Sequence, residues 1–106
     1  MLTPFAADAE DAATQSFVEK YVPVHGTEPD QFAADGYDAV YIVKAAMEQC
    51  GKTPADADFN EAMVAAMYEI TVDGLTGTMT WDDNNEPNKP AKAMVFHDGV
   101  AELFAE

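Results

Sequence analysis

Residues 39–47 read Ala-Val-Tyr-Ile-Val-Lys-Ala-Ala-Met, and Lys44 is the only charged residue among them. The β-branched and aromatic residues in this stretch are also compatible with a buried strand. A helix is favoured because the sequence contains neither Gly nor Pro between Gly36 and Gly51. We therefore predict a helix over about residues 30–50. Since it is apolar nearly all round, we expect it to be covered on more than one side.

The sequence predicts one further helix on either side of this one. Before it, apolar residues recur at helical spacing after Asp8, a candidate N-cap, and Pro23 interrupts the pattern. The first helix should therefore span about residues 9–22. After it, Asp58 begins an aspartate version of the capping box, and a one-sided apolar stripe follows. This pattern predicts a helix over about residues 58–70.

Strand signals are clear only in the last third of the chain. Alternating polar and apolar residues predict a strand over about residues 77–81. Two further runs, at about 92–97 and 100–104, flank the pair Asp98-Gly99. An Asp-Gly pair between two such runs favours a type I′ hairpin, whose turn needs a positive φ at both central residues.

The predicted elements belong to the α/β class. They form a single partial domain over residues 1–106, with three helices followed by a strand and a C-terminal β-hairpin. In an α/β lobe a strand normally precedes each helix. The order found here therefore indicates part of a larger lobe.

The charge of the chain excludes several classes of partner. It has 20 acidic residues against 5 lysines and no arginine, which gives a formal net charge of −15. Nucleic acid binding requires clustered Lys or Arg, and anionic membrane surfaces attract basic segments, so neither partner is expected. We expect no targeting signal within these residues, and no apolar run reaches the ~20 residues that span a bilayer.

No side chain stands out as a catalytic group. Ser16 is expected in the middle of a helix, and we interpret Cys50 as a small apolar residue at a helix end rather than a nucleophile. The loop over residues 82–86 has oxygen-bearing side chains, as calcium loops do, but Pro87 stands where such loops have glycine. We predict no enzymatic activity, no catalytic residue, no metal site and no cofactor.

One helix start could face a small ligand. Phe32 and Tyr37 lie near the beginning of the helix over residues 30–50, and Asp35 stands between them. Main-chain N–H groups at a helix N-terminus can face the anionic end of a zwitterion, next to an aromatic wall and a carboxylate. The alternative is that both aromatic residues belong to the core.

Several short strings follow one another along the chain in a specific order. They are Thr3-Pro4-Phe5, Phe17-Val18-Glu19-Lys20-Tyr21, residues 26–29, Ala33-Ala34-Asp35-Gly36-Tyr37-Asp38-Ala39, Asp73-Gly74-Leu75-Thr76-Gly77 and Met79-Thr80-Trp81-Asp82. In this order and spacing they resemble the C-terminal part of type I periplasmic binding proteins. The most similar group is the branched-chain amino acid (Leu/Ile/Val) substrate-binding proteins of ABC importers. The resemblance covers essentially the whole chain.

The resemblance implies a fold and a site. Family members have two α/β lobes joined by three crossing segments, with the ligand in the cleft between the lobes. The chain would contain the helices of one lobe, the third crossing at about residues 81–90, and the terminal strands. Phe32 matches an apolar ligand-binding contact in the cleft, and Asp35 is a second ligand-binding candidate. Tyr37 and Asp38 match a recurring Tyr-Asp pair that we interpret as structural.

The resemblance also implies a function. We predict a C-terminal fragment of a periplasmic or extracellular, lipid-anchored solute-binding protein. It would deliver amino acids, branched-chain ones in the first place, to the permease of an ABC importer. The alternative is a free-standing acidic protein-interaction module with a basic partner. Uncovered apolar helix faces in such a fragment should cause self-association, including exchange of elements in a domain-swapped homodimer.

Overall fold

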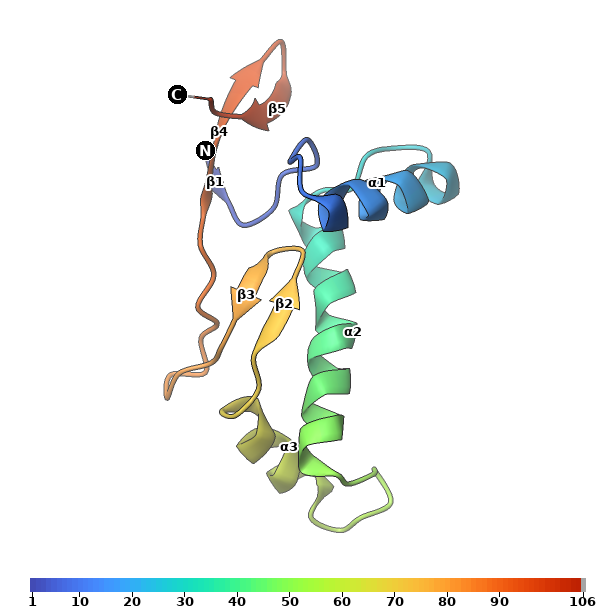
Figure 1. Cartoon of the computed structure of the whole chain (residues 1–106), viewed down its shortest axis with the longest axis vertical. Helices are drawn as coiled ribbons and strands as arrows, with labels where there is room; N and C mark the ends of the chain where they lie inside the picture. Colours follow the sequence, from blue (N-terminus) through green and yellow to red (C-terminus); the bar gives the residue numbers. More distant parts are fainter. Residues whose placement is uncertain (106) are drawn as a thin grey trace.

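The computed structural model describes residues 1–105, which form an elongated molecule with extents of 53 × 31 × 21 Å. Figure 1 shows α2 along the long axis, α1 across its upper end and α3 at its lower end. The helices are α1 (Ala12–His25), α2 (Gln31–Cys50) and α3 (Phe59–Met67). The strands are β1 (Leu2–Thr3), β2 (Val72–Gly74), β3 (Gly77–Met79), β4 (Lys92–His97) and β5 (Val100–Leu103).

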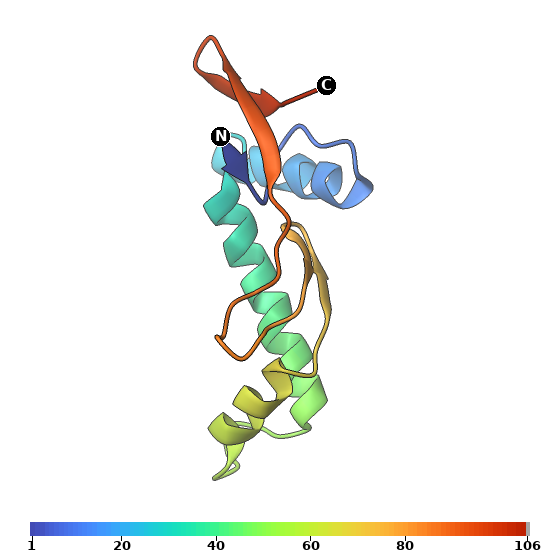
Figure 2. The same cartoon turned by 90° about the vertical axis from the view of Figure 1, so that its left-hand side faces the viewer.

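The strands form two small antiparallel sheets. In the first sheet the order is β1-β4-β5, with Leu2 opposite Ala93 and Met94 opposite Leu103. In the second, β2 pairs with β3, and β2 lies against α2 (Figures 1 and 2). The predicted α/β class is confirmed, with three helices followed by strands and a C-terminal hairpin. The short strands β1 and β2 were not predicted.

Helix α2 matches its predicted bounds, and the strand alternative is wrong. Its N-cap is Asp30, whose carboxylate accepts a hydrogen bond from the Ala33 N–H at 2.9 Å. Its C-cap is Gly51, which has a φ of 65°. This left-handed conformation is accessible to glycine at little cost and ends the helix.

Helix α1 starts later than the predicted residue 9. The carboxylate of Asp11 accepts a hydrogen bond from the Thr14 N–H at 3.0 Å and so caps the helix. This hydrogen bond also lowers the pKa of Asp11. Asp8, the predicted cap, instead accepts a hydrogen bond from the Leu103 N–H of β5 at 2.9 Å. A long-range partner therefore removes Asp8 from the helix start.

The ends of α1 and α3 also differ from prediction. Pro23 lies inside the last turn of α1 instead of ending the helix at the predicted residue 22. The helix continues to His25, and Gly26 is its C-cap. Helix α3 is shorter than the predicted 58–70, and Asp58 makes no capping hydrogen bond with its side chain. The Asp58 carboxylate lies 2.8 Å from the Lys52 ammonium group instead, and this hydrogen bond lowers the pKa of Asp58.

The C-terminal hairpin forms where the sequence predicts it. Strand β4 covers the predicted residues, and β5 ends one residue earlier than predicted, at Leu103. Asp98 and Gly99 have φ values of 50° and 82°, as a type I′ turn requires. Strand β3 is shorter than the predicted 77–81, since Trp81 takes part only in an isolated bridge with Pro87.

A buried carboxylate joins α2 to the turn between β2 and β3. Asp38 is 1% exposed, and its oxygens accept hydrogen bonds from the Leu75 N–H at 2.8 Å and from the Thr76 N–H at 2.9 Å. The Thr76 hydroxyl donates a third hydrogen bond at 2.7 Å. Three donors on one carboxylate satisfy a charge that would otherwise be costly to bury. The residue is thus structural, as predicted.

Gly74 permits this close approach of helix and turn. A Cβ at Gly74 would lie 2.6 Å from Oδ2 of Asp38 and 2.7 Å from Cε of Met79. Both distances are shorter than any ordinary carbon contact, so any larger residue would displace the Asp38 carboxylate or Met79. Close packing of the turn against α2 therefore requires glycine at position 74.

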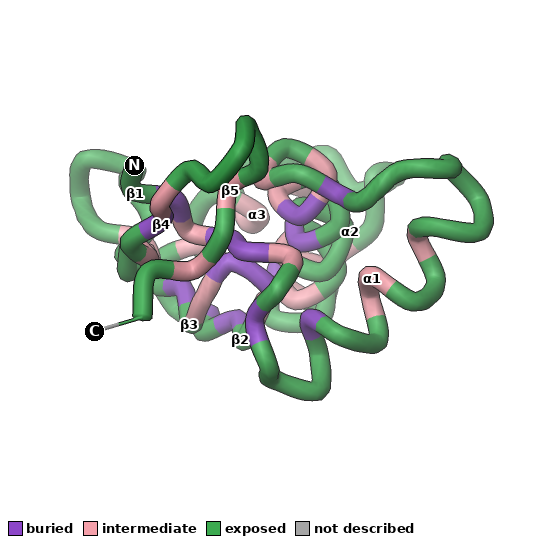
Figure 3. Tube along the Cα trace, turned by 90° about the horizontal axis from the view of Figure 1, so that it is seen from above, coloured by how far each residue is buried: buried purple, intermediate pink, exposed green. Residues whose placement is uncertain are grey.

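The hydrophobic core is divided into three small clusters. The first fills the space between α2, α3 and the β2–β3 sheet, the second lies under α1, and the third lies under the β4–β5 hairpin. They are centred on Ala46 and Met79, on Phe5 and Ala34, and on Ala6 and Met94. Figure 3 shows exposed residues over most of the trace.

One apolar face of α2 has no cover in the described residues. Val40 is 69% exposed and Val43 is 50% exposed, while Ala34, Asp38 and Ala46 on the opposite face are buried. The expectation that this helix is covered on more than one side is met only in part: α1 packs on Tyr37, but Val40 and Val43 stay exposed within residues 1–105. We call Val40 and Val43 the exposed apolar stripe on α2.

Replacing Asp38 should destabilise the fold. Asp38→Ala leaves the N–H groups of Leu75 and Thr76 and the Thr76 hydroxyl without their acceptor, at an expected cost of about 3 kcal/mol in the free energy of unfolding. Asp38→Asn keeps the shape and one acceptor oxygen, so we expect a smaller loss. Urea unfolding followed by circular dichroism measures both. The matched control is Asp83→Asn on the exposed surface, and equal stability of the Asp38 variants and this control would contradict the role of the buried carboxylate.

Candidate ligand cleft

A cleft lies between the start of α2 and the β4–β5 hairpin. Its volume is about 490 Å³, and its walls come from residues within 1–7, from residues 28–32, and from Met94 and residues 99–101. These three segments are far apart in the sequence. They meet because β1 pairs with β4, which holds the N-terminal segment against the hairpin. The cleft therefore has helical elements on one side and a β-hairpin on the other.

Phe32 is the aromatic residue that α2 contributes to the cleft wall. It lies in the first turn of α2, and its side chain is 78% exposed. The alternative that Phe32 belongs to the core is wrong. An exposed phenylalanine at a cleft loses hydration when an apolar ligand covers it, which favours binding.

The Asp30 carboxylate lies at the helix N-terminus beside Phe32, which the sequence suggested as a place for an anion. The Asp30 carboxylate already accepts the Ala33 N–H, and it places a negative charge at the end of the helix. Glu28 and Asp30 both line the cleft. This end of the cleft is therefore acidic and aromatic.

Asp35 does not line the cleft. Its carboxylate lies 3.0 Å from the ammonium group of Lys89, and both side chains are partly buried. Lys89 belongs to the segment that leads from β3 to β4. The ion pair therefore attaches this segment to α2.

Sequence reasoning missed a second attachment, between Thr3 and Gln31. The Thr3 hydroxyl donates to the side-chain oxygen of Gln31 at 2.8 Å, and Thr3 is buried. The Lys92 ammonium group donates to the carbonyl oxygen of Pro4 at 3.2 Å. The N-terminal segment is thus bonded both to the first turn of α2 and to the start of β4. Neither Thr3 nor Gln31 belongs to a binding motif, so only their spatial contact identifies them.

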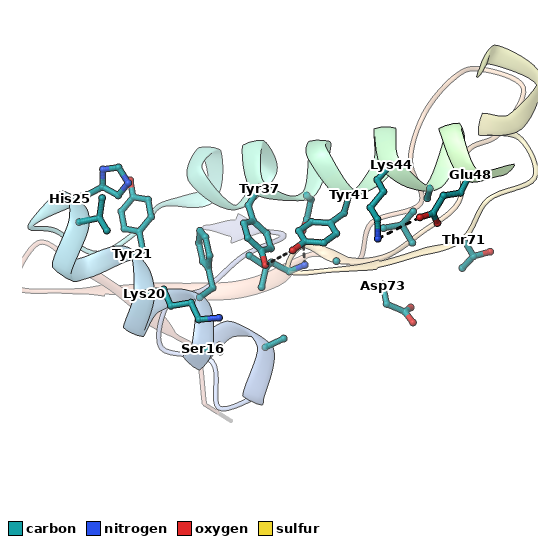
Figure 4. A pocket seen from close by; sticks show the side chains of 18 residues that line it. Ser16, Lys20, Tyr21, His25, Tyr37, Tyr41, Lys44, Glu48, Thr71 and Asp73 are labelled. Carbon is teal, nitrogen blue, oxygen red and sulfur yellow. Dashed lines mark hydrogen bonds and ion pairs between the residues drawn. The ribbon is translucent and has the colours of Figure 1, made fainter. Parts of the chain in front are cut away.

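A larger groove of about 680 Å³ runs between α1, α2 and β2 (Figure 4). The Tyr37 and Tyr41 hydroxyls lie 3.2 Å apart, and this hydrogen bond raises the pKa of Tyr37. The Tyr37 ring packs on Phe17 with 4.8 Å between ring centroids. Tyr37 is therefore a packing residue between α1 and α2, in agreement with its predicted structural role.

Cys50 and the loop over residues 82–86, the two groups considered in the sequence for catalysis and for calcium, make ordinary packing and turn contacts. The Cys50 thiol contacts the carbonyl oxygen of Met47 and the sulfur of Met63, and neither can act as a general base toward it. The Asp82 carboxylate accepts the N–H groups of Asn84 and Glu86, which is turn chemistry. Among residues 1–105, no three His, Cys, Asp or Glu side chains gather in a way that could hold a metal ion.

None of the helices described is both long enough and apolar enough to cross a membrane.

Residues 1–99 match the family model described as "Periplasmic binding protein". A search among curated proteins finds no match. The family match confirms the predicted resemblance to periplasmic binding proteins. It also agrees with the prediction that the chain has no enzymatic activity.

Solved structures of ABC-transporter binding proteins share the fold. A leucine binding protein, LivK, from Thermotoga maritima is 24% identical with a TM-score of 0.75, and the match covers 98% of this chain and 29% of that one. The isoleucine complex of LivJ from Streptococcus pneumoniae is 24% identical with a TM-score of 0.74, over 96% and 28%. A solute binding protein from R. palustris in complex with benzoate is 20% identical with a TM-score of 0.77, over 96% and 28%. The chain thus spans less than a third of each of these proteins.

The ion pair between Asp35 and Lys89 should stabilise the attachment of the β3–β4 segment to α2. Because both side chains are partly buried, we expect a coupling free energy of about 1 kcal/mol between them. A double-mutant cycle with Asp35→Asn, Lys89→Met and the double variant, followed by urea unfolding, measures this value. The exposed pair Lys44–Glu48, at 3.5 Å, is the control and should give a smaller coupling. A zero coupling for the first pair would show that the ion pair does not fix the segment.

Proposed function

Since this chain belongs to the periplasmic binding protein family, we propose that it forms part of an extracytoplasmic solute-binding protein that delivers an amino acid to an ABC importer. The observation that supports this most is the cleft between the start of α2 and the β4–β5 hairpin. The parent protein would be periplasmic or extracellular, and its partner would be the permease of the importer.

The packing on the two sides of the cleft supports closure around a ligand. Phe5, Ala34 and Leu75 form a cluster on the helical side, whereas Ala6 and Met94 belong to a separate cluster under the hairpin. Two bodies with separate cores, joined by extended segments, can rotate relative to one another about those segments. Such closure would be the signal that the permease reads.

An apolar amino acid, branched-chain in the first place, fits the wall that this chain supplies. Phe32 offers an apolar surface to the ligand's side chain. The cleft residues described contain no lysine, so the ligand's carboxylate would be bound by another part of the parent. Two of the compared structures are a leucine binding protein and an isoleucine complex, but the third contains benzoate. The fold alone does not determine the ligand.

Replacing Phe32 should weaken ligand binding without unfolding the protein. In the full-length parent, Phe32→Ala should raise the Kd for leucine, isoleucine or valine by roughly tenfold or more, since an apolar contact is lost. Isothermal titration calorimetry measures the Kd. Phe96→Ala is the matched control, because Phe96 is also exposed but does not line the cleft. Equal effects of the two substitutions would contradict the placement of the ligand at Phe32.

The 106-residue chain alone should bind these amino acids weakly or not at all. Calorimetry on the isolated chain tests this, and submicromolar binding would overturn the view that the remaining cleft wall lies in the rest of the parent.

We further propose that the isolated chain self-associates through the exposed stripe on α2. A contiguous apolar surface of this kind favours contact with a second copy. Sedimentation velocity at increasing concentration should show dimers or larger species, and Val40→Lys together with Val43→Lys should restore a monomer. Val24→Lys is the control, because Val24 is exposed on α1, away from the stripe. A stable wild-type monomer at high concentration would contradict this proposal.

A further inference from the structure

Acidic side chains cover the whole molecule instead of one region. Among the acidic residues described, only Asp38 is buried and only Asp35 is half-buried, while all others are exposed on helices, strands and loops alike. A small domain made for solubility needs a net charge of only ~2–8. The formal charge of −15 on 106 residues therefore exceeds what solubility requires.

Few positive groups compensate this charge within the chain. The described residues form three ion pairs between lysine and a carboxylate, namely Lys44–Glu48, Lys52–Asp58 and Lys89–Asp35. Against 20 acidic residues, these leave most carboxylates without a cationic neighbour.

Repulsion between the exposed carboxylates should extend across the width of the molecule at low salt. Electrostatic interactions are screened over ~30 Å at 0.01 M salt and over ~3 Å at 1 M. The two shorter extents of the molecule are 31 and 21 Å. In dilute buffer most of the exposed carboxylates across the width of the molecule therefore repel one another, and at molar salt only close neighbours do.

The core provides little to oppose that repulsion. Of the buried apolar residues, Ala6, Ala9, Ala34, Ala46 and Ala66 are alanines, which remove little apolar area from water. The three clusters are also separate. Self-repulsion of a high net charge destabilises the compact state, and a small divided core is sensitive to it.

We infer that this fold is adapted to a medium of high ionic strength, in which monovalent cations at about molar concentration screen its carboxylates. No specific cation site is required, because the effect comes from the net charge of the surface. An exported protein meets the salt of the external medium directly, so the inference extends the proposed location without depending on the ligand.

Thermal unfolding at different salt concentrations tests the inference. The midpoint should rise by about 10 °C or more between about 0.05 M and 2 M NaCl, and KCl should act similarly. Sucrose, which favours burial without screening charge, should not reproduce the whole rise. Equal midpoints at low and high salt, or a chain that stays unfolded at every salt concentration, would overturn the inference.

Charge variants separate screening from the general effect of salt on apolar surface. Glu10→Gln, Glu19→Gln, Asp83→Asn, Glu86→Gln and Glu102→Gln together change the formal charge from −15 to −10. None of these five side chains takes part in a hydrogen bond or ion pair within residues 1–105, so the combined variant should fold and depend less on salt. Its matched control exchanges Glu for Asp and Asp for Glu at the same positions and keeps the charge. Equal salt dependence of the two variants would refute the inference.

Discussion

The hydrogen bonds to the Asp38 carboxylate are the constraint on which the rest of the structure depends. They join the middle of α2 to the turn between β2 and β3, which is 37 or more residues away in the sequence. Because Gly74 has no side chain, the turn can approach the helix closely enough for these bonds to form. The chain after β3 then runs back along α2 to Lys89, where the Asp35 carboxylate binds it. Phe32 lies at the start of the same helix, in the wall of the cleft.

Elements with strong local signals could be predicted from the sequence, and others could not. Helix α2 has a side-chain cap at Asp30 and a left-handed glycine at its end, and the hairpin turn needs only Asp98 and Gly99. At Asp8 and Asp58 the local signal was misleading, because groups outside the helix bind the carboxylate, and for Asp8 that group is 95 residues away. The Leu103 N–H takes Asp8, and the Lys52 ammonium group takes Asp58. No pattern of neighbouring residues reveals such partners.

The residues of the candidate site also differ in whether local sequence could predict them. Phe32 was identified because an aromatic residue at a helix start, together with the resemblance, indicates a cleft contact. Asp35 follows three residues later, and sequence spacing alone could not show that Lys89 binds it. The contact between Thr3 and Gln31 has no signal at all, since it depends on the pairing of β1 with β4. The attachments that shape the cleft are all long-range, whereas the residue exposed in it is recognisable locally.

Helix α2 is apolar on two faces, one buried in the core and the other exposed at Val40 and Val43. One face is covered by β2, β3 and α3, and a helix surrounded by protein on one side only would be expected to have charged residues at positions such as 40 and 43. In a chain with 20 acidic residues, the absence of any at these positions is informative. Exposed charged residues do occur elsewhere on α2, at Lys44 and Glu48. Cover over Val40 and Val43, such as the second copy proposed above, therefore fits the sequence of α2 better than solvent does.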